Sequence, residues 1–250
     1  VSPFGVWKNK STDPRGSDTK AGQTTYENLY ADPLLWMEKG WLDYLIPQVY
    51  WSMELPVASH RKIVDWWSNN SRNTNLYIGN GPYKIRNNSD KAWDKKKELP
   101  NQISYARTKN TVDGNAFFSA KSLMNDNTDV VRYLKRRYYK NVANTPISKS
   151  APQMQKDLID LEAISKEKDS IKLIFNNLES IRYVMIYPYN KSENEVYPIK
   201  KLIAKLPIQS SEKLSIPQEI IKKRKRIDLT FIDFYGRESQ PISVHLDKAN

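Results

Sequence analysis

VSPFGVWKN (residues 1–9) and GWLDYLIPQVYW (residues 40–51) are two short apolar runs that each end in aromatic and amide side chains. Between them lie a polar loop, residues 9–23, and a helical segment, residues 26–39, which Pro33 divides into two pieces. A strand, a loop, a helix and a second strand in this order form the βαβ unit of a parallel sheet. Parallel α/β folds carry their sites at the carboxyl ends of the strands, so these two run ends are where we look for function.

The alternation of strands and helices continues to residue 139. The pattern predicts further strands at residues 75–80 and 115–120, and helices at residues 59–69, 100–111 and 126–139. Ser59 is suited to the N-cap of its helix, and Pro100 to the first turn of the next one. Four strand–helix pairs are half of a (β/α)8 barrel, which needs about 250 residues when complete.

Five runs in this part of the chain carry a resemblance to a known family: SPFGVW (2–7), DPRGSDT (13–19), DYLIPQVYW (43–51), LYIGNGPYKI (76–85) and NAFFSAKSL (115–123). In these motifs and their spacing, residues 1–140 resemble the bacterial glycosyl-hydrolase-like family of the YngK type. The resemblance implies that the four strands are strands five to eight of a TIM barrel and that the first half of the barrel is missing. It also implies a glycan-cleaving protein of the cell envelope, periplasmic or surface-exposed, secreted or a lipoprotein, in which a small β-sandwich follows the barrel.

The pattern changes after a polar, proline-containing linker. Short strands are predicted at residues 158–164, 171–175, 181–189, 199–206, 213–216, 227–234 and 242–246, with turn signals such as those at residues 190–194 between them. Many short strands favour a two-sheet sandwich of the fibronectin type III or immunoglobulin-like class, whereas a second α/β domain would need helical periods that are missing here. We therefore predict two domains, residues 1–145 and 153–250, of α/β and all-β class respectively.

Charge indicates which partners to consider. The chain has 40 Lys and Arg against 28 Asp and Glu, a net charge of +12. Residues 1–150 hold 23 basic against 14 acidic residues, and residues 151–250 hold 17 against 14. Such a charge favours anionic partners, but we interpret the basic residues as scattered over a solvated surface. Nucleic-acid binding stays the alternative, and we expect no nucleic acid as partner because no known motif for it accompanies the charge.

The residue types that several kinds of catalytic and metal sites require are absent or rare in this sequence. Without cysteine there are no disulfides and no thiolate metal sites, and His60 and His245 are the only histidines, which argues against a Ser-His-Asp triad or a histidine zinc site. We expect no cofactor and no metal. No apolar run approaches the length of a membrane helix. Because the chain begins inside an apolar strand without Met, we interpret it as a fragment.

Aromatic residues are the first candidates for a glycan site, because their flat faces suit the apolar C–H groups of sugar rings. Trp7 and Trp51 end their strands at the expected open face and are predicted to line a pocket. Four other tryptophans have helical spacing and are expected to pack helices onto the sheet: Trp36, Trp41, Trp66 and Trp67.

Polar residues at the strand ends complete the predicted binding set. Alternation along a strand places Gln48 and Tyr50 on one face, toward the barrel mouth, with Trp51 on the other. A packing role, in which Gln48 and Tyr50 bond each other or the backbone, is the alternative. Asn9 follows the first strand. Tyr83 and Lys84 after the third strand, and Ser119 and Lys121 after the fourth, are the remaining binding candidates.

Glycoside hydrolysis normally uses two carboxyl groups that flank the scissile bond. The predicted strand ends hold no such pair, and Glu54 is the one acidic residue placed shortly after a strand. Asp13 and Asp18 lie in the first loop, where Arg15 makes a structural ion pair an equal alternative. The resemblance implies that the family's acidic residues follow the fourth barrel strand, outside this chain, so we expect the catalytic acid and base to be missing.

The sequence therefore predicts the C-terminal part of a glycoside hydrolase that acts on a bacterial or dietary glycan, such as one derived from peptidoglycan. The expected partners are this glycan and either the missing barrel half or a second copy of the chain. The competing interpretation is a non-catalytic module that binds glycans or the cell wall with the same residues.

Overall fold

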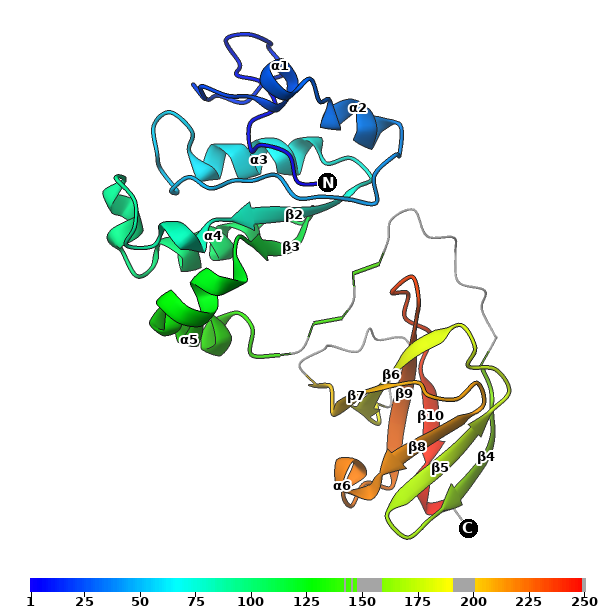
Figure 1. Ribbon diagram of the computed structural model, residues 1–250. Helices are drawn as coiled ribbons and strands as arrows, with labels where there is room; N and C mark the ends of the chain where they lie inside the picture. The colour runs from blue at the N-terminus through cyan, green and yellow to red at the C-terminus, as the bar shows by residue number, and fades with distance from the viewer. Residues whose placement is uncertain (142, 145, 148–158, 191–200, 249–250) are drawn as a thin grey trace. The chain divides into compact units, whose positions relative to one another are not determined.

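The computed structural model describes residues 1–141, 143–144, 146–147, 159–190 and 201–248 (Figure 1). The chain divides into two compact units, the first formed by Val1–Lys140 and the second mainly by the part of the chain after residue 150. Both ends that we predicted for the domains, residues 145 and 153, lie outside the described residues. The boundary thus stays a prediction.

A parallel sheet organises the first unit. Its strands β1 (Tyr44–Leu45), β2 (Asn75–Asn80) and β3 (Val112–Phe117) lie side by side in chain order. Phe4 forms a parallel bridge with Gln48, and Gln48 forms one with Gly79 of β2. The first segment of the chain therefore lies beside the segment that contains β1, on the side away from β2. The four predicted strand segments are therefore neighbours, but the first makes a single bridge, and the fourth ends at Phe117 rather than at residue 120.

Helices begin where capping residues and prolines allow them to begin. They are α1 (Thr25–Leu29), α2 (Pro33–Glu38), α3 (His60–Asn70), α4 (Glu98–Ala106) and α5 (Thr128–Arg137), with 3-10 turns η1 (Pro82–Lys84) and η2 (Lys91–Asp94) and a π-helical turn η3 (Ser122–Asp126). The Ser59 hydroxyl accepts a hydrogen bond from the Lys62 amide, as predicted for an N-cap. Asp32 caps α2, whose first residue is Pro33, and so the predicted break between the two helices is confirmed.

The core of the first unit joins α3 to the sheet. Ile63, Val64 and Trp67 on α3 pack against Leu76 and Ile78 of β2, and all five side chains are fully buried. Trp67 therefore packs the helix onto the sheet as predicted. Trp41 does not, because it lies beyond the end of α2, after Gly40 with its φ of +67°, and its side chain is 66% exposed.

The second unit consists of two antiparallel sheets. One contains β4 (Leu161–Lys166), β5 (Ser170–Phe175) and β8 (Lys213–Pro217); the other contains β6 (Ile181–Pro188), β7 (Ala204–Pro207), β9 (Arg226–Asp233) and β10 (Ile242–His245). A short helix, α6 (Gln218–Ile221), follows β8. Both sheets contribute to one core, in which the rings of Phe175 and Phe231 meet edge to face at 5.2 Å. The predicted strand positions at residues 158 and 199–200 and most of the turn at 190–194 lie outside the described residues.

Candidate functional site

A cavity of about 370 Å³ opens in the first unit at the carboxyl ends of the parallel segments. It is lined by Phe4, Gly5, Lys20, Ala21, Gly22, Gln23, Gln48, Tyr50, Trp51, Val57, Ala58, Tyr83 and Lys84. These residues come from the segment after the first bridge, the 20–23 part of the long loop, the chain after β1, and η1 after β2. The sequence-predicted residues Gln48, Tyr50, Trp51 and Tyr83 are thus brought together, and their part in binding stays a prediction.

The inner wall of the cavity depends on a close approach of two backbone segments at Gly5. A Cβ atom on Gly5 would lie 2.6 Å from the carbonyl oxygen of Gln48 and 2.6 Å from the ring of Trp51, and therefore only glycine fits. Gln48 is also held, because its amide Nε2 donates a hydrogen bond of 3.0 Å to the carbonyl of Ser2. Trp51 lies in the same cavity as Gln48, contrary to the strand alternation, because the regular strand ends at Leu45 and the chain bends at Trp51.

Three aromatic rings meet beside the cavity. The ring of Tyr50 lies edge to face with Tyr83 at 5.9 Å and is nearly parallel to Phe118 at 6.1 Å. Burial raises the pKa of the Tyr50 and Tyr83 hydroxyls, which keeps both groups neutral hydrogen-bond donors over a wide pH range. Phe118, 61% exposed and directly after β3, was missed in the sequence analysis, although its place at a strand end is the signal that selected Trp7 and Trp51.

Among the described residues, the charged side chains that line the cavity are Lys20 and Lys84, and this lining includes no Asp or Glu. Partial burial lowers the pKa of the Lys84 ammonium group, and the charge of Asp90 acts in the opposite direction. Aromatic faces with a few amide, hydroxyl and ammonium donors form a surface that accepts a polar ligand with apolar faces. The cavity lacks the acid and base that hydrolysis requires.

A buried chain of polar side chains lies behind the cavity and was not foreseen. The Asn115 amide donates to Asn80 at 2.8 Å, and the Asn80 amide donates to Gln102 at 3.0 Å. Gln102 in turn donates to the Trp51 carbonyl at 3.1 Å and to the Glu98 carboxylate at 2.9 Å, and that carboxylate also accepts the Met53 amide. The network therefore ties α4 to the backbone on both sides of residue 52, and fixes the segment that carries Trp51.

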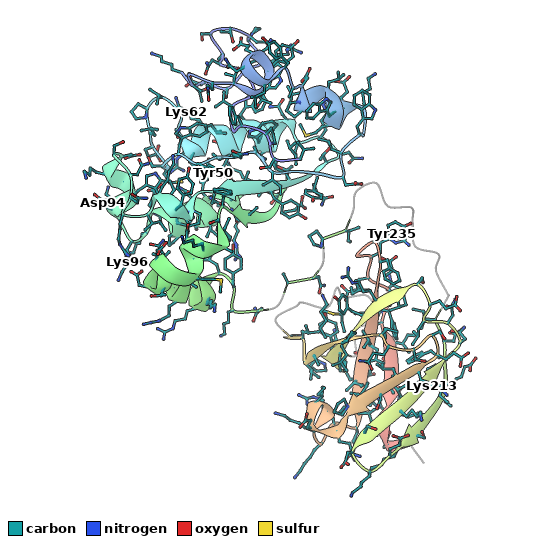
Figure 2. The ribbon with its side chains drawn as sticks, viewed as in Figure 1. Tyr50, Lys62, Asp94, Lys96, Lys213 and Tyr235 are labelled. Atoms are coloured by element: carbon teal, nitrogen blue, oxygen red, sulfur yellow. The ribbon has the colours of Figure 1, made fainter. Side chains whose placement is uncertain are left out.

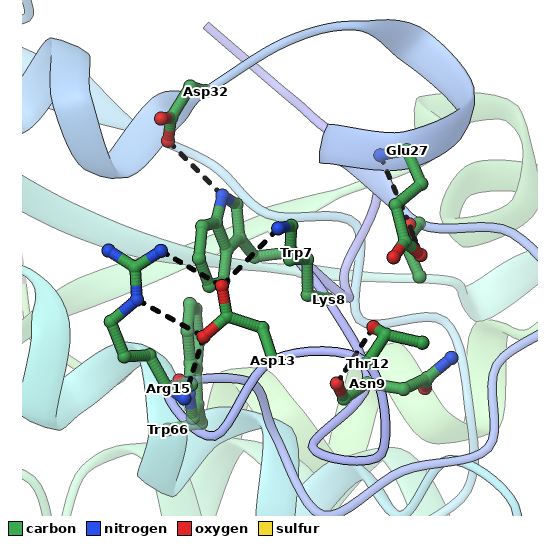
Figure 3. Close-up of polar contacts among 10 residues, drawn as sticks. Trp7, Lys8, Asn9, Thr12, Asp13, Arg15, Glu27, Asp32 and Trp66 are labelled. Carbon is green, nitrogen blue, oxygen red and sulfur yellow. Dashed lines mark hydrogen bonds and ion pairs between the residues drawn. The ribbon is translucent and has the colours of Figure 1, made fainter.

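Trp7 does not line the cavity, so this part of the predicted site is wrong. Its ring is 1% exposed, lies parallel to Trp66 at 5.9 Å, and donates its Nε1 hydrogen to Asp32 (Figure 3). The Arg15 guanidinium lies 5.1 Å from the centre of the same ring and also pairs with Asp13. The Arg15 guanidinium beside Asp13 holds the pKa of that carboxyl well below its usual range. Asp13 and Arg15 therefore form a structural ion pair.

Asn9 makes structural hydrogen bonds and does not line the cavity. Its Oδ1 accepts hydrogen bonds from the Ala21 amide at 2.9 Å and the Thr19 hydroxyl at 2.8 Å, while its Nδ2 donates to the Ala21 carbonyl at 2.9 Å. Ala21 itself lines the cavity. Asn9 therefore positions one wall of the cavity without lining it.

Two other candidates lie outside the cavity as well. Lys121 is exposed, directly before η3, and Glu54 is exposed and pairs with Arg61 at 2.7 Å. His60 is fully buried, with Nδ1 3.0 Å from the Val49 carbonyl, and so it has a packing role. In the described ranges no group of three or more His, Asp or Glu side chains could hold a metal ion, and no helix there is long and apolar enough to cross a membrane. Figure 2 shows the side chains of both units and labels Tyr50, one of the residues that line the cavity.

Comparison with known proteins places these residues in context. Residues 1–95 match the family model described as glycosyl hydrolase-like 10. Glycosyl hydrolase YngK of Bacillus subtilis (strain 168) is 40% identical over 162 residues, which are 62% of this chain and 32% of that protein. Glycosyl hydrolase DigH of Escherichia coli (strain K12) is 45% identical over 87 residues, which are 34% of this chain and 20% of that protein. The chain thus spans about a third of the first relative and a fifth of the second.

A solved structure also aligns with the chain. The crystal structure of wild-type OgpA from Akkermansia muciniphila matches with a TM-score of 0.30 and 10% identity, over 82% of this chain and 76% of that one. A likeness at this level carries no argument about fold or function.

Proposed function

Since the N-terminal part of this chain belongs to the YngK-type glycosyl-hydrolase-like family, we propose that it is the glycan-binding part of a protein that hydrolyses O-glycosidic bonds. The substrate in this proposal is a bacterial or dietary glycan, such as one derived from peptidoglycan. The protein acts in the cell envelope, in the periplasm or on the surface.

The cavity is the observation that carries this proposal. It lies at the carboxyl ends of parallel segments, the place where α/β folds bind ligands. Tyr50, Trp51 and Tyr83 supply flat faces, and Gln48 supplies amide groups at the same wall. In this proposal the rings stack on sugar faces and the polar groups bond the hydroxyls.

The charges of the cavity indicate which part of the proposed reaction this chain supplies. Because no carboxylate lines the cavity, the proposed acid and base come from segments of the intact protein that this chain does not include. The four parallel segments with their helices support the assignment to the second half of a (β/α)8 barrel. Its partner is then the first half of the barrel or a second copy of the chain. The strand order β4-β5-β8 against β10-β9-β6-β7 supports a fibronectin III-like second domain.

The test uses the intact protein, with residues numbered as in this chain. Gln48→Ala is expected to weaken glycan turnover at low substrate concentration about five- to 150-fold, because a ligand group loses a partner worth about 1–3 kcal/mol. Asn69→Ala, an exposed amide on α3, is the matched control and is expected to leave turnover unchanged. Equal turnover by the Gln48 variant and the wild type would refute the placement of the glycan in this cavity.

The missing carboxylates also support a second candidate, a glycan-binding protein without turnover. Calorimetry and an assay for new reducing ends, run on the same intact protein and glycan, separate the two. Binding that depends on Gln48 with no new reducing ends would establish the binding protein. Turnover that depends on Gln48 would establish the hydrolase.

A further inference from the structure

An uninterrupted run of five basic residues, Lys222–Arg226, follows α6 directly and ends on the first residue of β9 in the second unit (Figure 1). This contradicts our expectation that the basic residues are scattered. Residues 151–250 hold 17 basic and 14 acidic residues, so without the run 12 basic residues would face 14 acidic ones. The positive charge of this part of the chain is therefore concentrated at one place.

The run is presented to solvent on a fixed backbone. All five residues are exposed, whereas Ile221 before them and Ile227 after them are buried in the core. The Arg224 guanidinium donates to the Ile221 carbonyl at 3.0 Å, and the Arg226 guanidinium lies over the ring of Tyr189 at 5.3 Å. These contacts at the middle and the end of the run lower the entropy that a ligand must remove when it orders the two arginine side chains.

The part of the chain that the structure describes places no carboxylate in an ion pair with these charges. Lys222 even occupies a backbone conformation with φ +57° and ψ −133°, which glycine adopts more easily. The cations of α5 differ in this respect, because Lys135, Arg136 and Arg137 lie in its last turn and offset the helix dipole.

We propose that Lys222–Arg226 bind a linear polyanion with closely spaced phosphate groups. Five residues span at most about 17 Å, so several phosphates of one chain can pair with the run at the same time. Clusters of five or more Lys and Arg residues are a known pattern for polyanion sites. Tyr189, which is 37% exposed with Arg226 over its ring, is a single aromatic side chain, whereas single-stranded nucleic-acid sites stack successive bases on several aromatic rings. The run therefore pairs with charge and does not form a base-stacking platform. This site is independent of the proposed glycan activity.

The test measures the binding of fluorescently labelled inorganic polyphosphate to the full 250-residue chain by anisotropy. One variant changes all five residues of the run to Gln. The matched control, called the α5 control, changes to Gln five exposed cations that lie on α5 or shortly after it: Arg132, Lys135, Arg136, Arg137 and Lys140. Each variant lowers the net charge of +12 by five. The double variant Lys223→Gln/Lys225→Gln keeps the two arginines that contact the protein, and is used if the fivefold variant loses its fold by circular dichroism.

The wild type is expected to lose affinity with salt at a logarithmic slope of about −3.5, which means roughly a hundredfold between 50 and 200 mM. The variant with all five substitutions in the run is expected to bind polyphosphate at least tenfold more weakly and to lose most of the salt dependence. The double variant is expected to show an intermediate loss of affinity. The α5 control is expected to bind like the wild type. Equal losses in the run variant and the α5 control would overturn the proposal, since only net charge would then matter. The proposal would also be overturned if an oligo-dT strand of equal charge bound more tightly than polyphosphate. It would likewise be overturned if the chain bound phosphatidylglycerol vesicles but did not bind polyphosphate.

Discussion

Gly5→Ala tests whether the cavity wall is as close-packed as the structure indicates. The new Cβ would lie 2.6 Å from both the Gln48 carbonyl oxygen and the Trp51 ring, and 3.2 Å from the Gln48 carbonyl carbon. Because two of these atoms belong to the backbone, the chain itself must move. Overpacking of this kind typically lowers the free energy of unfolding by about 1–3 kcal/mol. Urea unfolding followed by tryptophan emission measures this loss for the first unit alone, since all seven tryptophans lie in residues 7–93.

Gly22→Ala is the control, because Gly22 also lines the cavity and an added Cβ there meets no atom within 4 Å. It is expected to leave stability unchanged or to raise it by about 0.4–1 kcal/mol, through the reduced entropy of the unfolded chain. If Gly5→Ala unfolds at the same urea concentration as the wild type or as Gly22→Ala, the described contact between residue 5 and the Gln48–Trp51 segment is wrong.

Three further predictions concern stability. Burial lowers the pKa of His60 to about 4 from its usual value of about 6.5. As the pH falls, the imidazole is therefore protonated in the unfolded chain before it is protonated in the folded one. The free energy of unfolding of the first unit should consequently fall by roughly 3 kcal/mol between pH 6.5 and pH 4. This loss should vanish in the His60→Asn variant and persist in the His245→Asn variant. If both variants kept the pH dependence of the wild type, the buried, neutral imidazole of His60 would be contradicted. Trp67→Ala should cost about 3–5 kcal/mol in urea unfolding and the exposed Trp41→Ala less than about 0.5, and the reverse order would contradict the described core. Residues 153–250 expressed alone should melt cooperatively, because both their sheets share one core, and a non-cooperative melt would refute the domain boundary.

Local signals in the sequence predicted helix starts well. Ser59 and Pro33 act through contacts within one turn, so their effect is visible without the rest of the fold. Strand ends were harder to predict. Val112–Phe117 begins three residues before the predicted strand, since pairing with β2 decides which residues become extended.

The candidate site was predicted in part, for a related reason. Gln48 and Tyr50 could be placed because they directly follow an apolar run, whereas the burial of Trp7 depends on Trp66, 59 positions away in the chain, and on the long loop. Glu98 and Gln102 are polar residues four apart on a helix, a spacing that usually marks a solvated face. Their burial is visible only when Asn80 and the Trp51 carbonyl are placed beside them.

The three hydrogen bonds of Asn9 close the neck of the loop between residues 9 and 21. The loop tip at Ser11 and Thr12 is exposed, and within this loop the residues that line the cavity begin only at Lys20. Changes in length at the tip are therefore absorbed beyond the neck, without displacing Ala21. The tip is accordingly a suitable point for inserting a peptide tag or a fluorescent label in work on the intact protein, and a position where homologous chains can differ in length while keeping the same pocket.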